Sequence, residues 1–164
     1  MRILIVSDNH RQIERFTHLM RKVAPIDMLI HCGDADGSEE AISRAAGCAV
    51  EMVSGNNDYV GWGNKRSLPT EREFMLGRHK VWLVHGHRQQ VNAGEDRIYQ
   101  EALSRGADIV MYGHTHRPSV NIRPELSLIN PGSLNQPRQE GRRPSYIIME
   151  LDGDGAAHYT VNYL

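Results

Sequence analysis

The chain has 164 residues, of which 40% are hydrophobic and 24% are charged, with 19 Lys and Arg against 20 Asp and Glu. This length predicts one soluble domain over residues 1–164, which buries about 70% of the surface of the unfolded chain. The formal net charge of −1 argues against a broad basic face of the kind that binds nucleic-acid phosphates. We therefore expect a small substrate and no strong nucleic-acid footprint.

The two cysteines, Cys32 and Cys48, are too few for a disulfide framework and have no zinc-like spacing, so a cytoplasmic location is expected. The first apolar run, Ile3–Val6, reaches Ser7 and Asp8 too soon for a signal peptide or a membrane span. We therefore expect no secretion and no membrane partner.

The first part of the chain predicts two strands joined by a helix. Residues 3–6 predict a buried strand, and apolar residues at three- and four-residue steps predict a helix over 11–22, which stops before Pro25. A second strand over 28–30 leads into Gly33-Asp34. Because a right-handed crossover makes the two strands parallel neighbours, Asp8 and Asp34 should emerge at the same sheet edge.

The chain continues with a helix over 38–46, for which Ser38 is the predicted N-cap and Gly47 the stop. A third strand over 49–53 ends in Gly55-Asn56-Asn57-Asp58, and residues 59–70 are expected to be irregular.

The second half begins with a hairpin around Gly77-Arg78, which ends in His85-Gly86-His87. A helix over 91–105 precedes a strand over 108–112, which leads into Gly113-His114-Thr115-His116. Short runs separated by Pro and Gly then predict an antiparallel sheet, with strands at 119–123, 126–130, 145–151 and 157–162.

Five strand ends thus present carboxylates, amides or imidazoles beside a glycine or a tight polar loop. Imidazole and carboxylate together suit manganese, iron, nickel or zinc. Alternation along a strand would point Asp8 with His10, and His114 with His116, into one cleft. A pair of metal ions needs one bridging carboxylate, and Asp34, alone at the end of a central strand, is the candidate. Cys32 could be a thiol ligand, but a small buried side chain is the better interpretation.

The ordered motifs D-x-H, GD, GN-x-[DE], H-G-H and GH-x-H resemble those of the calcineurin-like metallophosphoesterase superfamily. Without a cap or insertion domain, the chain is most similar to the small bacterial and archaeal YfcE-type phosphodiesterases. The resemblance extends from Asp8 to Asn130-Pro131-Gly132-Ser133.

The resemblance implies an α/β fold, a two-sheet β sandwich flanked by helices. It also implies two divalent ions per chain, with a hydroxide between them that attacks phosphorus in line with the leaving group. One ion would bind the residues matching Asp8, His10, Asp34 and His116. The other would bind those matching Asp34, Asn56, His85 and His114.

One position departs from the family pattern. Many members have a histidine after the motif asparagine, where this chain has Asn57, although Asp58 follows. Asn57 is either a catalytic or phosphate-contacting residue or a turn residue. His87 is either a substitute acid or a side chain that orients a ligand. Without the motif histidine, activated aryl diesters should be cleaved better than alkyl monoesters.

The sequence therefore predicts a metal-dependent phosphodiesterase acting on a small phosphoester, with manganese favoured over nickel, iron and zinc. Base rates for soluble proteins suggest a homodimer. The alternative is a metal-binding scaffold of low activity, because the same fold serves as a protein-interaction subunit in retromer. A nuclease similar to the recombination-repair branch is a third reading, disfavoured by the short chain and its neutral charge.

Overall fold

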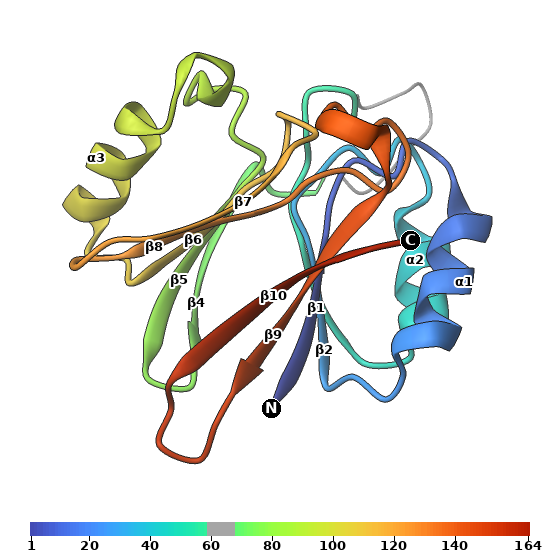
Figure 1. Ribbon diagram of the computed structural model, residues 1–164, viewed down its shortest axis with the longest axis horizontal. Helices are drawn as coiled ribbons and strands as arrows, with labels where there is room; N and C mark the ends of the chain where they lie inside the picture. Colours follow the sequence, from blue (N-terminus) through green and yellow to red (C-terminus); the bar gives the residue numbers. More distant parts are fainter. Residues whose placement is uncertain (59–67) are drawn as a thin grey trace.

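Ten strands form two five-stranded sheets, in a computed structural model that describes residues 1–58 and 68–164 (Figure 1). The first sheet has the order β10-β9-β1-β2-β3, with β1 at Arg2–Val6, β2 at Met28–His31, β3 at Ala49–Met52, β9 at Ser145–Leu151 and β10 at Ala157–Tyr163. The second has the order β4-β5-β6-β8-β7, with β4 at Glu71–Leu76, β5 at His79–Val84, β6 at Ile109–Met111, β7 at Pro118–Ile122 and β8 at Ser127–Pro131.

Helices cover the outer faces of both sheets (Figure 1). The helices α1 (Ile13–Val23) and α2 (Glu39–Ala46) lie beyond the first sheet, and α3 (Asp96–Arg105) lies beyond the second. Two single 3₁₀ turns, η1 (Val91–Ala93) and η2 (Glu140–Arg142), complete the described elements. The predicted two-sheet β sandwich flanked by helices is confirmed.

Alternation in β1 shows why the continuous apolar runs are buried on both faces. Ile3 and Ile5 belong to the core between the two sheets. Leu4 and Val6 belong to the core beneath α1 and α2. Such doubly buried strands are typical of parallel sheets covered by helices, and β1 pairs with β2 in parallel as predicted.

The carboxyl ends of the parallel strands of both sheets meet at one end of the sandwich. Asp8 N donates to Gly33 O at 3.0 Å, which joins the loops after β1 and β2. Gly113 N donates to His85 O at 3.0 Å and joins the loops after β6 and β5. The two sheets are linked there by Leu134 N, which donates to Ser7 O at 3.1 Å. The polar motifs of the sequence therefore converge at this end.

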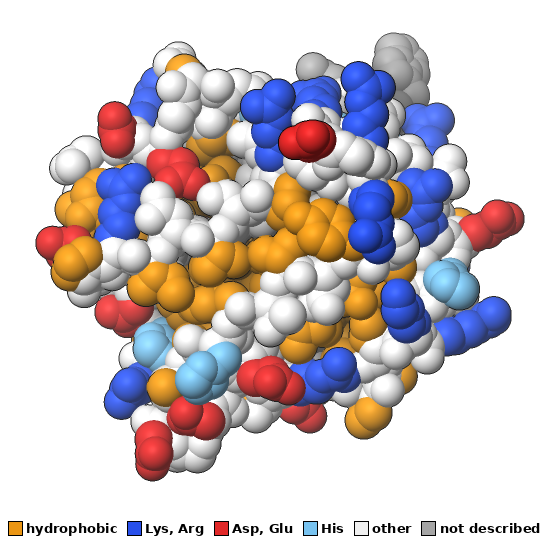
Figure 2. All heavy atoms as spheres, in the orientation of Figure 1, with side chains coloured by type: hydrophobic (Ala, Val, Ile, Leu, Met, Phe, Trp, Pro, Cys, Tyr) orange, Lys and Arg blue, Asp and Glu red, His pale blue; other side chains and the backbone are white. Residues whose placement is uncertain are grey.

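One edge of each sheet lies on the same side of the sandwich. These edge strands, β7 and β10, contact each other. Val120, Tyr159 and Val161 from these edges are half-buried and pack against the core between the sheets. Figure 2 shows hydrophobic side chains in a band across the middle of this face.

The prediction that the last four strands form one antiparallel sheet is wrong. The strands β7 and β8 pair antiparallel, but β8 also pairs with β6 in parallel. The strand β9 instead pairs antiparallel with β1 of the other sheet, and β10 pairs with β9. Short amphipathic strands specify which face is buried, but not which partner they take.

The predicted helix over 91–105 is broken into η1 and α3. Gly94 has φ 138° and separates the two, because this backbone conformation is one that only glycine adopts readily.

The remaining elements lie within two residues of their predicted bounds. The Gly47 stop is confirmed as a left-handed C-cap. Ser38 stands at the N-cap without a capping bond, and its hydroxyl instead donates to Ala35 O at 2.6 Å and accepts from Asn9 Nδ2 at 3.0 Å. Residues 59–67 of the expected irregular segment lie outside the described residues.

Within the described residues, no helix is long and apolar enough to span a bilayer.

The docking of α3 on the second sheet gives a test of the outer core. Ile98 is fully buried on this helix, whereas Leu103 is 37% exposed. We expect Ile98→Ala to lower the free energy of unfolding by about 2–5 kcal/mol, because it leaves a cavity. The matched variant Leu103→Ala should change it by less than about 0.5 kcal/mol. Equal losses in urea denaturation would contradict this packing.

Candidate metal centre

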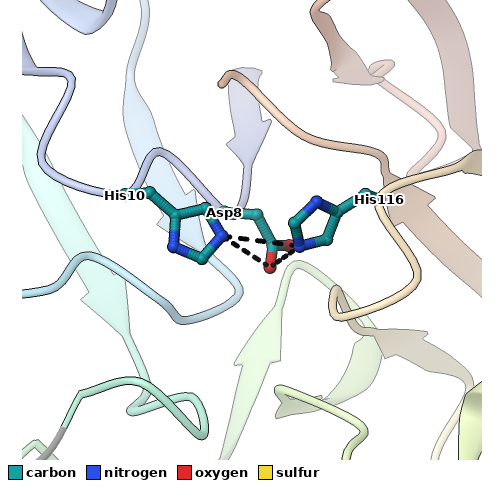
Figure 3. Close-up of side chains that lie close together, drawn as sticks. All are labelled: Asp8, His10 and His116. Carbon is teal, nitrogen blue, oxygen red and sulfur yellow. Dashed lines mark hydrogen bonds and ion pairs between the residues drawn. The ribbon is translucent and has the colours of Figure 1, made fainter. Parts of the chain in front are cut away.

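The carboxylate of Asp8 lies at the centre of the converging loops, buried immediately after β1. His116 Nε2 lies 3.0 Å from Asp8 Oδ1, and His10 Nε2 lies 3.9 Å from the same oxygen. The two Nε2 atoms are 3.4 Å apart. Figure 3 shows both imidazoles directed at the carboxylate. Asp8, His10 and His116 are called the His116 cluster below.

A second cluster lies beside the first. His85 Nε2 lies 3.4 Å from Asp34 Oδ2, 3.1 Å from Asn56 Oδ1 and 4.0 Å from Asp8 Oδ1. Asp34, Asn56 and His85 are called the His85 cluster below. His114 is adjacent, with its ring centroid 5.2 Å from that of His85. The carboxylate that lies within reach of both clusters is Asp8, and a bridging role for Asp34 stays a prediction.

Three of the histidines are oriented by acceptors at Nδ1. His85 Nδ1 donates to Cys32 O at 2.8 Å, and His116 Nδ1 donates to Gln136 O at 2.6 Å. His10 Nδ1 donates to Asp36 Oδ2 at 3.0 Å. These bonds hold each imidazole with its Nε2 atom directed at the centre, which is the orientation that metal-ligating histidines require.

Asn57 and Asp58 organise the loop that carries Asp34. Asn57 donates twice to the Asp34 carboxylate, from its backbone N to Oδ1 at 2.8 Å and from Nδ2 to Oδ2 at 2.6 Å. Asp58 accepts from three backbone amides, those of Asp34, Asp36 and Gly55, at 2.6–2.7 Å. Asp58 therefore fastens the loop after β2 to the loop after β3.

His87 lies at the edge of the centre, with its ring 5.5 Å from that of His85 and 6.1 Å from that of His114. Its Nδ1 is buried and has no hydrogen-bond partner among the described residues. Burial and the neighbouring His85 lower the pKa of His87. The structure therefore brings both predicted catalytic residues, Asn57 and His87, next to the predicted ligands.

The electrostatics of the centre favour ionised carboxylates. Burial raises the pKa of Asp8, but the adjacent His116 imidazole and the charge of His85 together outweigh it and lower the pKa below its usual value. Burial raises the pKa of Asp34, but the hydrogen bond and charge of His85 and the two hydrogen bonds from Asn57 together outweigh it and lower the pKa. Burial lowers the pKa of His85, yet Asp34 and Asp8 raise it to about 9. A cation entering the His85 cluster therefore competes with a proton.

The donor set fits divalent transition metals. Asp8, His10 and His116 each offer one ligand atom within 4.8 Å of the others, and so do Asp8, Asp34 and His85. Asp8 Oδ1 is buried without a hydrogen-bond partner among the described residues. A buried carboxylate oxygen in that state is costly unless it binds a cation. The mixture of imidazole and carboxylate matches manganese, iron, nickel and zinc better than calcium or magnesium.

The predicted cause of the convergence of these side chains, alternation along a strand, is wrong. Asp8, His10, His114 and His116 follow their strands rather than extending them, and their φ values lie between 44° and 67°. Left-handed turns, not strand alternation, direct these side chains. His114 and His116 consequently diverge, so that His116 joins the His116 cluster while His114 lies beside His85. Cys32 is fully buried, as the interpretation of a small core residue requires.

Supporting residues fasten the strained loops together. Ser133 Oγ donates to Asp8 O at 2.8 Å. Asn130 Nδ2 donates to Gly113 O and to Thr115 Oγ1, each at 3.0 Å. The Asn130-Pro131-Gly132-Ser133 segment thus acts on the ligand loops rather than on the centre itself.

Two residues that hydrogen-bond to predicted ligands, Asp36 and Asn92, were not predicted from the sequence. Asp36 orients His10, and the two-residue spacing of Asp34 and Asp36 was a usable signal. Asn92 Nδ2 donates to His114 Nε2 at 3.0 Å, and no sequence pattern marks it.

Comparison with known proteins agrees with this chemistry. A model of the calcineurin-like phosphoesterase superfamily domain matches residues 1–154. The probable metallophosphoesterase YsnB of Bacillus subtilis is 33% identical over 157 residues, which cover 95% of this chain and 88% of YsnB. The phosphodiesterase YfcE of Escherichia coli K12 is 32% identical over 81 residues, which cover 49% of this chain and 40% of YfcE.

Among solved structures, Vacuolar Protein Sorting 29 from Cryptosporidium parvum aligns with a TM-score of 0.75 and 21% identity. The alignment covers 99% of this chain and 97% of that protein. At this identity the likeness concerns the fold alone.

Gly55 provides a test of how tightly the centre is built. A Cβ at this position would lie 2.0 Å from Asp34 Oδ1 and 2.6 Å from Asp34 N, so Gly55→Ala must displace the carboxylate. We expect its Mn²⁺ affinity, measured by calorimetric titration, to fall roughly 10–100-fold. The matched variant Gly153→Ala, whose Cβ would meet nothing within 4 Å, should bind as the wild type does. Unchanged affinity in Gly55→Ala would refute the proposed role of Asp34.

Proposed function

This chain belongs to the calcineurin-like phosphoesterase superfamily and is a metal-dependent phosphoesterase, and we propose that it hydrolyses phosphodiesters at a centre of two divalent ions. The observation that carries the proposal is the convergence of three imidazole Nε2 atoms on two buried carboxylates. The likeness to the phosphodiesterase YfcE supports a diester as substrate.

The proposed ligand sets follow the two clusters. Asp8, His10, Asp34 and His116 would bind one ion, and Asp34, Asn56, His85 and His114 the other. When bound, two divalent ions lower the pKa of a water molecule between them and neutralise charge on the phosphoryl oxygens. The chain contributes the geometry, because Cys32 O, Gln136 O and Asp36 fix the imidazoles before any ion arrives.

Asn57 and His87 are proposed to act on the phosphoester itself. Asn57 Nδ2 lies 2.6 Å from Asp34 Oδ2, so the same amide is within reach of a phosphoryl oxygen that approaches this carboxylate. His87 lies beside His85 and His114 with a buried Nδ1 that none of the described residues binds. We assign to His87 a contact with the phosphate or transfer of a proton to the leaving group.

Manganese as the native metal, a cytoplasmic location and a homodimer stay predictions from the sequence. The small size of the substrate is likewise a proposal, supported by the net charge of −1.

A metal-binding scaffold of low activity is the second candidate. The fold similarity to Vacuolar Protein Sorting 29 is compatible with it. The complete ligand set and the oriented imidazoles favour the enzyme, because a site retained only as a contact surface has no need of aimed lone pairs.

Metal removal gives the first test of the proposed function. Protein stripped by a chelator should hydrolyse bis-p-nitrophenyl phosphate only after Mn²⁺, Ni²⁺, Zn²⁺ or Mg²⁺ is added back, with the largest rate for Mn²⁺. Asp34→Asn and His116→Ala should lower the restored rate by roughly 100-fold or more, because each removes a ligand. The matched variants Asp154→Asn and His18→Ala change exposed residues and should keep it.

Absence of turnover with every metal, despite two ions bound per chain by calorimetry, would overturn the enzyme and favour the scaffold. Turnover that persists in both ligand variants would point to a contaminant.

Because Asn57 stands where many family members have a histidine, we expect the hydrolysis rate to depend strongly on the leaving group. We expect activated aryl diesters to be cleaved at least roughly 100-fold faster than alkyl monoesters, because general acid catalysis contributes about 10²–10⁴-fold to poor leaving groups. Asn57→His should narrow this ratio. Comparable rates on both classes in the wild type would show that another residue already supplies the proton.

A further inference from the structure

A cavity of about 490 Å³ lies beside His114, at the edge of the metal centre. Its volume is within the range of small-molecule sites. Asn92 lines the cavity and also donates to His114 Nε2 at 3.0 Å, so the cavity and the metal centre share a wall. On the other side, Arg138 lines the cavity and its backbone N donates to His116 O at 2.9 Å. The cavity thus adjoins the loop that carries His114 and His116.

Two arginines give the cavity its charge. Arg117 and Arg138 both line it, and Arg117 Nε donates to Arg138 O at 3.3 Å, which keeps the two side by side. Figure 2 shows basic side chains gathered at the end of the molecule where η2 lies. The guanidinium fork matches the oxygens of a phosphate group.

The acidic residue in the wall, Glu95, does not offset this charge. Its carboxylate is already neutralised by Arg123, whose Nη2 lies 3.6 Å from Oε2. Both oxygens also accept hydrogen bonds from neutral donors, namely Tyr112 Oη at 2.6 Å, Ser119 Oγ at 3.3 Å and Asn121 Nδ2 at 2.6 Å. The cavity therefore presents excess positive charge to a ligand.

We propose that this cavity binds a second phosphate group, carried on one substituent of the phosphodiester. The inference rests on the proposed phosphodiesterase function and names its substrate class. The volume exceeds what one phosphate needs, which leaves room for the organic group that links the two phosphates. Arg117 and Arg138 are the specificity residues.

Binding is tested with two ligands that differ in one phosphate. Thymidine 3′,5′-bisphosphate should bind roughly tenfold more tightly than thymidine 5′-monophosphate, because charged hydrogen bonds to the second phosphate are added. Calorimetry in Mn²⁺ and again in chelator measures this ratio, which should shrink as salt is raised. A ratio of one under both conditions, or no binding of the bisphosphate under either, would overturn the proposal.

Variants show whether the arginines cause the preference. Arg138→Gln and Arg117→Gln should each bring the ratio toward one, and Arg138→Lys should retain part of it. Arg97→Gln removes an equal charge from an exposed position of α3 outside the cavity wall and should leave the ratio unchanged. A preference that survives Arg138→Gln and Arg117→Gln contradicts the assignment.

Kinetics separate this proposal from the function on which it rests. The 5′-(p-nitrophenyl) esters of the two nucleotides carry the same leaving group, and the ester with the 3′-phosphate should show roughly tenfold higher kcat/KM. Equal values for both esters overturn the second-phosphate site and leave the phosphodiesterase intact. Hydrolysis of neither ester, together with an arginine-dependent binding preference, overturns the phosphodiesterase and leaves the site.

Discussion

The buried carboxylate of Asp8 is the constraint on which the rest of the centre depends. Removing a charge from water is costly unless partners compensate it. Asp8 Oδ2 accepts from the backbone N of His114 at 3.1 Å, whereas Oδ1 faces the imidazoles of His116, His10 and His85. The protein thus keeps one oxygen for a cation and draws the histidines around it. A bound ion would satisfy this oxygen, so metal binding and folding stability are coupled here.

Backbone geometry creates this arrangement and requires support from residues outside it. Parallel strands of both sheets end together, and their ligands leave the strands in left-handed conformations that non-glycine residues adopt at a cost. Asp58, Asn130 and Ser133 compensate by bonding the loops to one another. Gly55 and Gly113 complete the arrangement, because a Cβ on Gly113 would lie 2.1 Å from Ser7 Oγ, as one on Gly55 would approach Asp34. The residues between the ligands are therefore as constrained as the ligands.

Much of this could be predicted from the residues, and the failures have identifiable causes. The β-α-β order alone placed Asp8 and Asp34 at one edge, since parallel neighbours end together. The partners of β9 and β10 could not be predicted, because the residues of a short strand indicate which face is buried but not which strand lies beside it. The roles of Asn92 and Asp58 depend on contacts between distant loops. The turn that separates His114 from His116 depends on backbone angles that residue spacing does not encode.

The residues proposed to bind metal belong to the sequence motifs, whereas the arginines proposed to select the substrate lie outside them. The proposed ligands come from strand ends that the fold brings together at one end of the sandwich. The cavity beside the metal centre is lined by η1, Arg117 and Arg138, which belong to no motif, and by Thr115 of the GH-x-H motif. These segments contact the centre through the Asn92 side chain and the backbone of His116, so Arg117 and Arg138 can be replaced without removing a proposed ligand. Under the proposed second-phosphate site, substrate choice in this chain is set by Arg117 and Arg138 rather than by the metal ligands.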